Sequence, residues 1–257
     1  MLDLRLQLSL AANYRSPSQR IRVVTEEWVA KNTGCPACSQ AISKVANNSP
    51  GLDFVCRQCD LAFELKSKRG FFGDKLVDGA YESMMSKIRR NAQSNFFLLN
   101  YDGDYLVTDL VLIPKRFIVP EIIECRPPLS PRARRAGWIG CNLKVSLLPA
   151  MGRIAYVKDR SVVSPGVVLA QWQKTNFLED VSFSSRGWLI AVMSCIERID
   201  RLGFTLEDVY SFVPHLQSLF PRNRHIKAKI RQQLQVLRDR GWLAFRGNGK
   251  YERTVAP

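Results

Sequence analysis

The sequence predicts an α/β (α+β) protein with a larger N-terminal domain, residues 1–181, and a smaller C-terminal domain, residues 182–257. Helical and strand-like patterns alternate along the first part, whereas the second part contains three helical stretches followed by a hairpin. Between them, near residues 179–185, the pattern becomes polar, which is typical of a linker. A chain of 257 residues with 46% hydrophobic residues can bury a core in each part, which excludes a disordered chain or a simple coiled coil.

Helices and strands are expected in turn along the N-terminal domain. Apolar residues recur at helical spacing over residues 17–32, which predicts a first helix. Residues 52–68 alternate apolar and polar side chains, which predicts two short strands joined by a turn. A second helix is expected over residues 76–93, followed by core strands over residues 95–101 and 104–114 that an Asp-Gly turn separates.

The rest of this domain is expected to contain a prominent loop and one more strand. Residues 126–142 are rich in Pro, Gly and Arg, which predicts a loop. Residues 153–158 read as a strand, and residues 164–178 have weak helical character.

The C-terminal domain is predicted to be a winged helix-turn-helix. Helical patterns cover residues 186–201, 205–219 and 222–240. They precede a hairpin over residues 242–253 that turns at Gly247-Asn248-Gly249. Three helices with a wing-like hairpin are typical of this DNA-binding fold.

One face of the third helix is expected to pack, and the other to read DNA. At 100° per residue, the packing face contains Ile226, Ile230, Gln233 and Leu237. The DNA-binding residues expected on the outward face, its flanks and the hairpin are Arg224, His225, Lys227, Ala228, Lys229, Arg231, Gln232, Gln235 and Lys250. Arg can pair with guanine, Gln with adenine, and a small apolar Ala can lie against a methyl group, while Lys suits phosphates.

Positive charge is concentrated in this helix and hairpin. The chain carries 38 Lys and Arg against 23 Asp and Glu, a net charge of +15, which favours a polyanion such as nucleic acid or an anionic membrane surface. Residues 222–250 contain nine Lys or Arg and one acidic residue, Asp239, so +8 of that charge lies in 29 residues. A solvated basic face or a protein-interaction module is the alternative to DNA binding.

The sequence disfavours a membrane partner. The longest uncharged apolar run without proline, residues 187–196, is ten residues long, about half of the roughly 20 that span a bilayer. Asp3 and Arg5 interrupt the stretch in which a secretory peptide would need apolar residues. We therefore expect no export.

Two C-x-x-C pairs predict a structural zinc site. The pairs are Cys35 with Cys38 and Cys56 with Cys59. The 17 residues between them fall in the range of a four-thiolate zinc ribbon. Four thiolates close a tetrahedral site and leave no open position, so the zinc would be structural and not catalytic. The remaining Cys125, Cys141 and Cys195 lack metal spacing and are expected to pack as small apolar side chains.

Asp53, Glu64 and Lys66 flank the second cysteine pair and predict a nuclease centre. Side chains alternate along a strand, so Glu64 and Lys66 share one face. An Asp and a Glu on neighbouring strands can bind Mg²⁺, which polarises a phosphate and activates water, while the Lys screens developing charge. This is the D-x(n)-E-x-K signature of the PD-(D/E)xK nucleases, with Leu52 where many members have Pro. The same spacing also occurs in ordinary exposed strands.

The chain also resembles one family from about residue 14 to its end. The segments that carry the resemblance are FELKSK, DGAY, RRAGWIGCN, SSRGW, FTLED, HIKAKIRQQLQVLRD and GNGKY. In this order they resemble the DpnI-like methyl-directed (type IIM) restriction endonucleases, which cut GATC sites that carry N6-methyladenine. The resemblance implies a PD-(D/E)xK nuclease domain with an embedded four-cysteine zinc site, and a winged helix that acts as a second reader of the same methylated sequence.

The resemblance also implies roles for particular residues. Asp53, Glu64 and Lys66 are implied as the active site, with Asp53 and Glu64 as Mg²⁺ ligands, and the four paired cysteines as zinc ligands. Trp138 aligns with the loop that the family uses near the methyl groups; the alternative is a Trp of the core. The Arg residues that flank it and favour a loop at the DNA are Arg132, Arg134 and Arg135.

The partner that follows is double-stranded, adenine-methylated DNA, and the cofactors are Mg²⁺ and Zn²⁺. Two alternatives stay open: a non-enzymatic zinc-ribbon and winged-helix DNA-binding regulator, and a methylation-independent nuclease of the repair type. Because no heptad or exposed apolar stripe argues for a dimer, we expect a monomer. A restriction enzyme is expected in the cytoplasm of a bacterial or archaeal cell.

Overall fold

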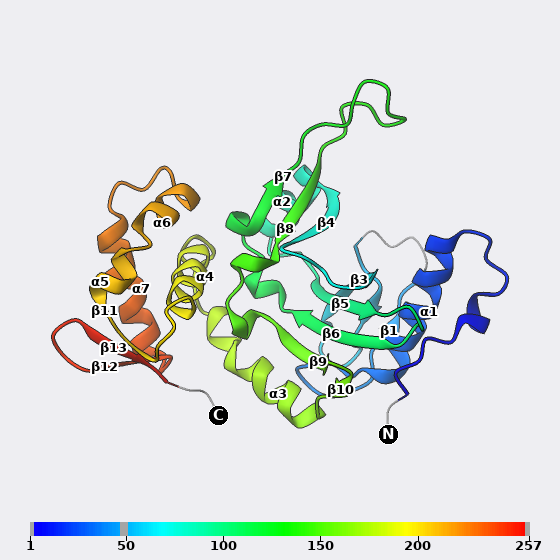
Figure 1. Ribbon diagram of the computed structural model, residues 1–257, viewed down its shortest axis with the longest axis horizontal. Coiled ribbons are helices and arrows are strands. Elements are labelled where there is room, and N and C mark those ends of the chain that lie inside the picture. Colours follow the sequence, from blue (N-terminus) through cyan, green and yellow to red (C-terminus); the bar gives the residue numbers. More distant parts are fainter. Residues whose placement is uncertain (1–2, 47–50, 255–257) are drawn as a thin grey trace.

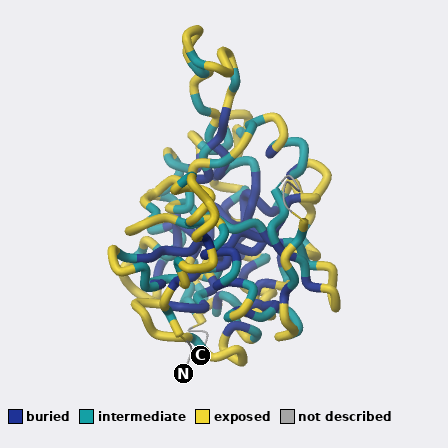
Figure 2. Tube along the Cα trace, turned by 90° about the vertical axis from the view of Figure 1, so that its right-hand side faces the viewer, coloured by how far each residue is buried: buried dark blue, intermediate teal, exposed yellow. Residues whose placement is uncertain are grey.

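The computed structural model describes residues 3–46 and 51–254 and arranges them in two lobes (Figure 1). The larger lobe, at the right of the figure, contains the central sheet. The smaller lobe, at the left, contains the last helices and the C-terminal hairpin. A loop over residues 126–139 projects from the top of the molecule, and Figure 2 shows that most of it is exposed while the strands at the centre are buried.

The central sheet has, within the described residues, seven strands in the order β1-β2-β3-β5-β6-β9-β10. The strands are β1 (Ser43–Lys44), β2 (Phe54–Val55), β3 (Ala62–Arg69), β5 (Asn95–Tyr101), β6 (Val107–Ile113), β9 (Ile154–Lys158) and β10 (Ser161–Val162). Strands β3 and β5 run parallel, and the other neighbours in this part of the chain run antiparallel. Every residue of β5 is buried, so this strand forms the centre of the lobe.

Helices cover both faces of the central sheet. They include α1 (Pro17–Asn32), which begins and ends as the sequence predicts, α2 (Tyr81–Arg89) and α3 (Pro165–Lys174). Side chains of β5 alternate between the faces. Phe97 lies in a core cluster with Trp28 of α1 and Trp172 of α3, whereas Phe96 lies in a second cluster with Ile88 of α2. Strand β5, which pairs with β3 in the sheet, is therefore packed on both faces.

A second sheet carries the projecting loop. In the described ranges it has three strands in the order β4-β8-β7, which are β4 (Lys75–Ala80), β8 (Gly140–Lys144) and β7 (Ile123–Cys125). The helix expected over residues 76–93 is wrong over residues 76–80, because β4 pairs antiparallel with β8 about 60 to 70 residues further along the chain, and α2 ends at Arg89. Such long-range pairing overrides the local helical pattern. The loop expected over residues 126–142 ends earlier, since β8 begins at Gly140.

The smaller lobe has the helix order and hairpin expected of a winged helix. Its elements are α4 (Phe183–Glu197), β11 (Gly203–Thr205), α5 (Leu206–Tyr210), α6 (Val213–Leu219), α7 (Ile226–Asp239), β12 (Leu243–Phe245) and β13 (Lys250–Arg253). The order β11-β13-β12 adds a third strand to the hairpin within the residues described. Gly247, Asn248 and Gly249 all have positive φ, which is the backbone conformation that the predicted turn needs.

Two boundaries in this lobe differ from the expected ones. The single helix expected over residues 205–219 is two helices, because Pro214 in the first turn of α6 cannot continue the preceding helix α5. The linker expected over residues 179–185 is shorter, since α4 already begins at Phe183.

Helix α4 joins the cores of the two lobes. All residues from Arg186 to Ile196 are buried, and α4 packs against α7 and against the short helix over Lys115–Phe117. One cluster of buried side chains therefore runs from Leu76 in β4 to Leu243 in β12. Gly187 leaves room for the side chain of Glu121, whose carboxylate a Cβ atom at this position would meet. None of the helices in the described ranges is long and apolar enough to cross a membrane.

Candidate active site and zinc site

The four paired cysteines come together at the turn of the β2–β3 hairpin. Their sulfur atoms lie within 4.8 Å of one another, with Cys35 Sγ 3.4 Å from Cys59 Sγ and Cys38 Sγ 3.6 Å from Cys56 Sγ. A tetrahedral zinc with Zn–S bonds of about 2.3 Å requires sulfurs about 3.8 Å apart. The four thiols therefore fit a structural zinc ion. No other group of three or more His, Cys, Asp or Glu side chains in residues 3–46 and 51–254 is close enough to share a metal.

The two cysteine pairs have the same backbone geometry. The N–H of Ser39 donates to the carbonyl of Cys35 at 2.8 Å, and the N–H of Asp60 donates to the carbonyl of Cys56 at 2.9 Å. Ser39 and Asp60 both have positive φ, 61° and 55°. Each pair is thus a tight turn that points two sulfurs at one centre, as four-thiolate zinc binding needs.

The cysteine thiols have perturbed pKa values. Burial raises the pKa of Cys35, and it raises that of Cys59 to about 11. Burial also acts on Cys56, but the backbone N–H groups of Gln58 and Cys59 outweigh it and lower the pKa of Cys56 to about 7. A metal ligand must be a thiolate, and zinc would stabilise this form of the cysteines that bind it. Of the other cysteines, Cys141 and Cys195 are buried as expected, whereas Cys125 is exposed, so that prediction is wrong.

The structure brings Asp53, Glu64 and Lys66 together on neighbouring strands. Asp53 directly precedes β2, and Glu64 and Lys66 lie on β3, which pairs with β2. The Asp53 carboxylate accepts a hydrogen bond from the backbone N–H of Leu65 at 2.7 Å. The Lys66 ammonium donates to the Glu64 carboxylate at 2.5 Å. Asp53 is therefore tied to the residue that separates the other two.

Two further side chains at this site were not found by sequence reasoning. Asp78 on β4 accepts a hydrogen bond from the Lys66 ammonium at 2.7 Å, and its side chain is almost fully buried. Arg22 on α1 lies 3.6 Å from the Asp53 carboxylate and also bonds to Glu26. Asp78 belongs to the DGAY segment. A helix is expected over residues 76–93, and a helix there does not place the Asp78 carboxylate beside Lys66.

The surroundings shift the pKa values of both Glu64 and Lys66. Burial raises the pKa of Glu64, and the Lys66 ammonium offsets this only in part. Burial disfavours the charged form of Lys66, but the carboxylates of Glu64 and Asp78 outweigh it, so the pKa of Lys66 is raised. Lys66 is therefore a cation at neutral pH that can lie against a phosphate.

An open cleft of about 690 Å³ lies beside these residues, between α1 and the β3–β4 segment. Asp53 and Lys66 line it, whereas Glu64 does not. Its basic side chains include Arg22, Lys68 and Lys75. Such a cleft offers a cationic path to the carboxylate of Asp53, as a phosphate backbone requires.

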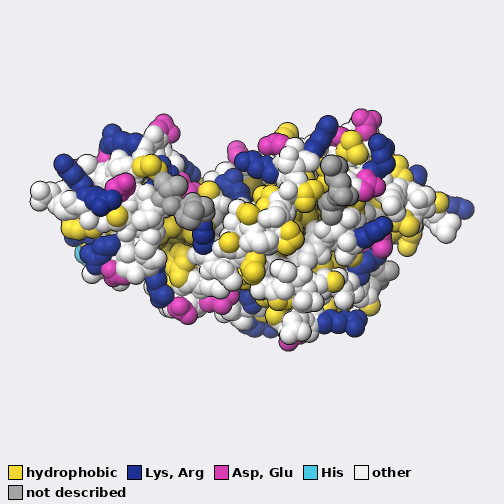
Figure 3. Space-filling model, turned by 90° about the horizontal axis from the view of Figure 1, so that it is seen from below, with side chains coloured by type: hydrophobic (Ala, Val, Ile, Leu, Met, Phe, Trp, Pro, Cys, Tyr) yellow, Lys and Arg dark blue, Asp and Glu magenta, His cyan; other side chains and the backbone are white. Residues whose placement is uncertain are grey.

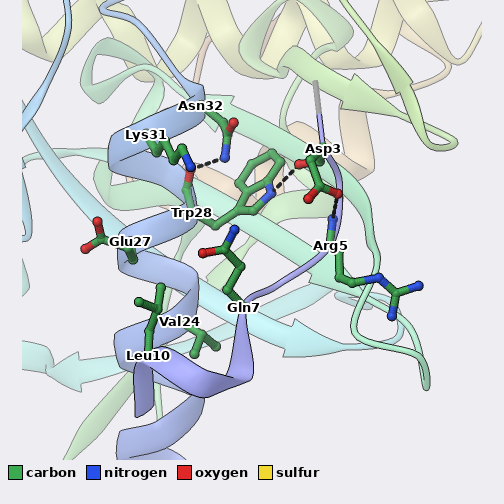
Figure 4. A pocket seen from close by; sticks show the side chains of 9 residues that line it. All are labelled: Asp3, Arg5, Gln7, Leu10, Val24, Glu27, Trp28, Lys31 and Asn32. Carbon is green, nitrogen blue, oxygen red and sulfur yellow. Dashed lines mark hydrogen bonds between the residues drawn. The ribbon is translucent and has the colours of Figure 1, made fainter. Parts of the chain in front are cut away.

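A separate cavity of about 480 Å³ lies between the N-terminal segment and α1, and none of the predicted site residues lines it (Figure 4). The indole N–H of Trp28 donates to the backbone carbonyl of Asp3 at 2.9 Å. The Asp3 carboxylate accepts a bond from the backbone N–H of Arg5. The Trp28 bond docks the N-terminal segment on α1, and the Asp3–Arg5 bond lies within that segment.

The outward face of α7 is exposed as the periodicity predicts. Ile226, Ile230, Gln233 and Leu237 are buried. Lys229 is partly buried, and the exposed residues of the predicted DNA-binding set are Arg224, His225, Lys227, Ala228, Arg231, Gln232, Gln235 and Lys250. Tyr210 of α5 accepts a hydrogen bond from Arg231 at 2.8 Å, and its ring lies 4.8 Å from the Lys227 ammonium. Two cations of this face are thus already oriented.

Trp138 lies in the projecting loop and belongs to neither core cluster. Its backbone N–H donates to the carbonyl of Arg135, and its carbonyl accepts from the N–H of Leu129. The Arg135 guanidinium lies 5.4 Å from the Trp138 ring, and the ring covers Gly140 so closely that a Cβ atom there would clash. The flanking Arg132, Arg134 and Arg135 are exposed.

Lys and Arg side chains occur on both lobes in the view of Figure 3.

A mixed α/β domain with a four-cysteine cluster, joined to a C-terminal helix-turn-helix domain, defines a class of DNA-binding proteins. The chain matches the model of DpnI, the Dam-replacing family, over residues 2–181. It matches the Dam-replacing HTH domain of the same family over residues 184–253. The chain therefore belongs to the DpnI, or Dam-replacing, family of methyl-directed restriction enzymes.

Proposed function

We propose that the protein is a Mg²⁺-dependent type II restriction endonuclease that hydrolyses double-stranded DNA at GATC sites carrying N6-methyladenine. The observation that carries this proposal is the placing of Asp53, Glu64 and Lys66 on paired strands beside a basic cleft, in a chain of this family. The mechanism, the GATC site and the dependence on methylation are parts of this proposal that family membership does not itself supply. We propose further that the nuclease and reader domains correspond to residues 1–181 and 182–257.

Asp53 and Glu64 are the residues that would hold Mg²⁺. Two carboxylates suit this cation, which usually binds one or two protein carboxylates together with waters and substrate phosphates. When bound, it polarises the scissile phosphate and lowers the pKa of a coordinated water. The Leu65 N–H keeps Asp53 in place, and Arg22 beside it adds positive charge near the cleft.

Lys66 acts on the phosphate in this proposal. Its ammonium is held by Glu64 and Asp78 and lines the cleft, so it can lie against a phosphate oxygen as negative charge develops in the transition state. The zinc cluster supports the arrangement from one end of the hairpin, because Cys56 and Cys59 lie in the turn between β2 and β3.

Both lobes are proposed to sense the methyl groups. A single buried methyl group is worth only about 1 kcal/mol, so strong discrimination needs more than one contact. Trp138 in the loop and Ala228 on α7 are apolar surfaces that can cover a methyl group in the major groove. The other proposed contacts are Arg134, Arg135, Arg224, His225, Lys227, Lys229, Arg231, Gln232, Gln235 and Lys250.

Cleavage of two plasmid preparations tests the proposal. Plasmids with and without adenine methylation are incubated with the full chain in the presence and in the absence of Mg²⁺. We expect cleavage of the methylated plasmid in Mg²⁺ only. Binding without cutting favours the non-enzymatic regulator, and equal cutting of both plasmids favours a repair-type nuclease. We also propose that the protein is a monomer, and its sedimentation with a duplex that contains one site gives the number of chains bound.

A further inference from the structure

The connection between β3 and β4 presents an aromatic side chain to solvent. Phe71 is 76% exposed, which makes it the most exposed of the large hydrophobic side chains in the described part of the chain. Its neighbour Phe72 is partly buried and packs against the core. Val77 on β4 is also exposed, at 60%. Phe72 and Val77 line the candidate active-site cleft, so the apolar surface around Phe71 continues into that cleft.

The base of this connection is anchored, so Phe71 is presented in a defined place. The N–H of Gly70 donates to the carbonyl of Tyr101 at 2.9 Å, and the side-chain amide of Asn100 donates to the carbonyl of Gly70. Gly70 has a φ of +77°, a conformation that other residues rarely adopt. At the far end, Gly73 has open space around it. Phe71 thus lies between Gly70, which is hydrogen-bonded to the neighbouring strand, and Gly73, which has open space around it.

The charges around Phe71 favour a nucleic acid as its partner. Lys68 and Arg69 precede the connection and are exposed. Lys75, which follows the exposed Asp74, is also exposed but forms an ion pair with Glu124 at 2.8 Å. Lys68 and Lys75 line the same cleft as Asp53 and Lys66. Proteins that bind single DNA strands hold the phosphate backbone with cations and stack the bases on aromatic rings. Exposed Phe side chains are also inserted between base steps by proteins that bend DNA.

We propose that Phe71 contacts a nucleobase of the duplex next to the scissile phosphate and thereby holds that strand in register with Lys66. This inference rests on the proposed function in one respect, namely that duplex DNA occupies the cleft. The ring stacks on or wedges beside the base, while Lys68 and Arg69 bind the adjoining phosphates. Phe72 packs against the core and so anchors the connection between β3 and β4.

DNA binding with Ca²⁺ in place of Mg²⁺ tests this without requiring cleavage and leaves the proposed zinc in place. A duplex with one adenine-methylated GATC site is titrated over a range of salt concentrations with the full chain and its variants. We expect Phe71→Ala to bind about 5-fold to 150-fold more weakly, the range measured for one base–aromatic stack, with an unchanged salt slope because no charge is removed. Lys68→Ala should make the salt slope shallower by about one phosphate contact. Phe71→Trp should retain the affinity.

Controls separate this inference from the proposed function and from folding. Val162→Ala, an exposed apolar position on β10, should bind as the wild type does. Thermal unfolding should be the same for Phe71→Ala and the wild type, since the side chain is exposed. Binding of Phe71→Ala within about twofold of the wild type, or a change in its salt slope like that of Lys68→Ala, overturns the inference. Failure of the wild type to cut in Mg²⁺ overturns the proposed function while the binding result still decides the role of Phe71.

Discussion

The β2–β3 hairpin and helix α7 hold their polar side chains in opposite ways. On the hairpin, Lys66 is bonded to both Glu64 and Asp78, and Asp53 is bonded to a backbone N–H. On α7, most of the outward side chains are exposed to solvent. The groups proposed for chemistry are thus held in place before DNA arrives, whereas those proposed for recognition stay mostly exposed, although Arg231 bonds to Tyr210 and Lys229 bonds to Gln232.

Replacing Lys66 should give the largest difference between an effect on cleavage and an effect on DNA binding. We expect Lys66→Ala to lower the cleavage rate about 100-fold to 1000-fold, because one preorganised electrostatic group at the reacting phosphate is lost. DNA affinity measured with Ca²⁺ in place of Mg²⁺ should change far less, since α7 is untouched. Lys158→Ala, an exposed lysine on β9, serves as the control. Parallel losses of binding and cleavage would show that Lys66 acts only as a phosphate anchor.

Removing one thiolate tests whether zinc supports the hairpin. Cys56→Ser should lower the melting temperature by about 5 to 10 °C and remove bound zinc, because the metal joins both cysteine pairs. Cleavage should fall with it, since Asp53 lies three residues before Cys56. Cys125→Ser, which changes an exposed cysteine outside the cluster, should keep the zinc content measured by mass spectrometry. Full zinc occupancy in Cys56→Ser contradicts the four-ligand assignment.

Replacing Gln232 tests whether the outward face of α7 reads bases. If it pairs with a base, Gln232→Ala should weaken binding to the GATC duplex about 10-fold and leave the salt slope unchanged. Lys229→Ala should instead weaken binding to all sequences and make the slope shallower by about one. The measurement is a salt titration on specific and scrambled duplexes. Equal effects of Gln232→Ala on both duplexes would remove it from base reading.

Trp138 should give the smallest effect. Losing its contact with a methyl group is worth about 1 kcal/mol, so Trp138→Ala should reduce the preference for methylated over unmethylated DNA about 5-fold. Because Trp138 lies in neither core cluster, the melting temperature should stay the same. A large loss of thermal stability would instead favour the alternative of a structural Trp.

Local patterns predicted much of the fold and part of the site. The ends of α1 and β5 agree with their expected residues, since apolar periodicity and strong β-forming side chains act over a few neighbours. The grouping of the four cysteines followed from their spacing for the same reason. The buried face of α7 followed from its helical period.

Contacts between distant segments could not be predicted in this way. Strand β4 forms because β8 pairs with it, and Asp78 reaches Lys66 only through that pairing. Arg22 reaches Asp53 because α1 packs on β3. The lobes share one core through α4, although the sequence suggested two parts with a polar linker. Truncation near residue 181 is expected to expose this core, so point variants test the recognition surface better.

The sequence by itself determined which residues can perform the proposed chemistry and recognition: the thiol pairs, the Asp-Glu-Lys set and the basic outward face of α7. Residue types and short-range spacing suffice for that. Only the tertiary structure decided how Lys66 is held, which cleft it lines, and that Phe71 is exposed beside it. Those features depend on segments brought together by strand pairing and core burial, and their free energy comes from contacts that no local stretch of sequence contains.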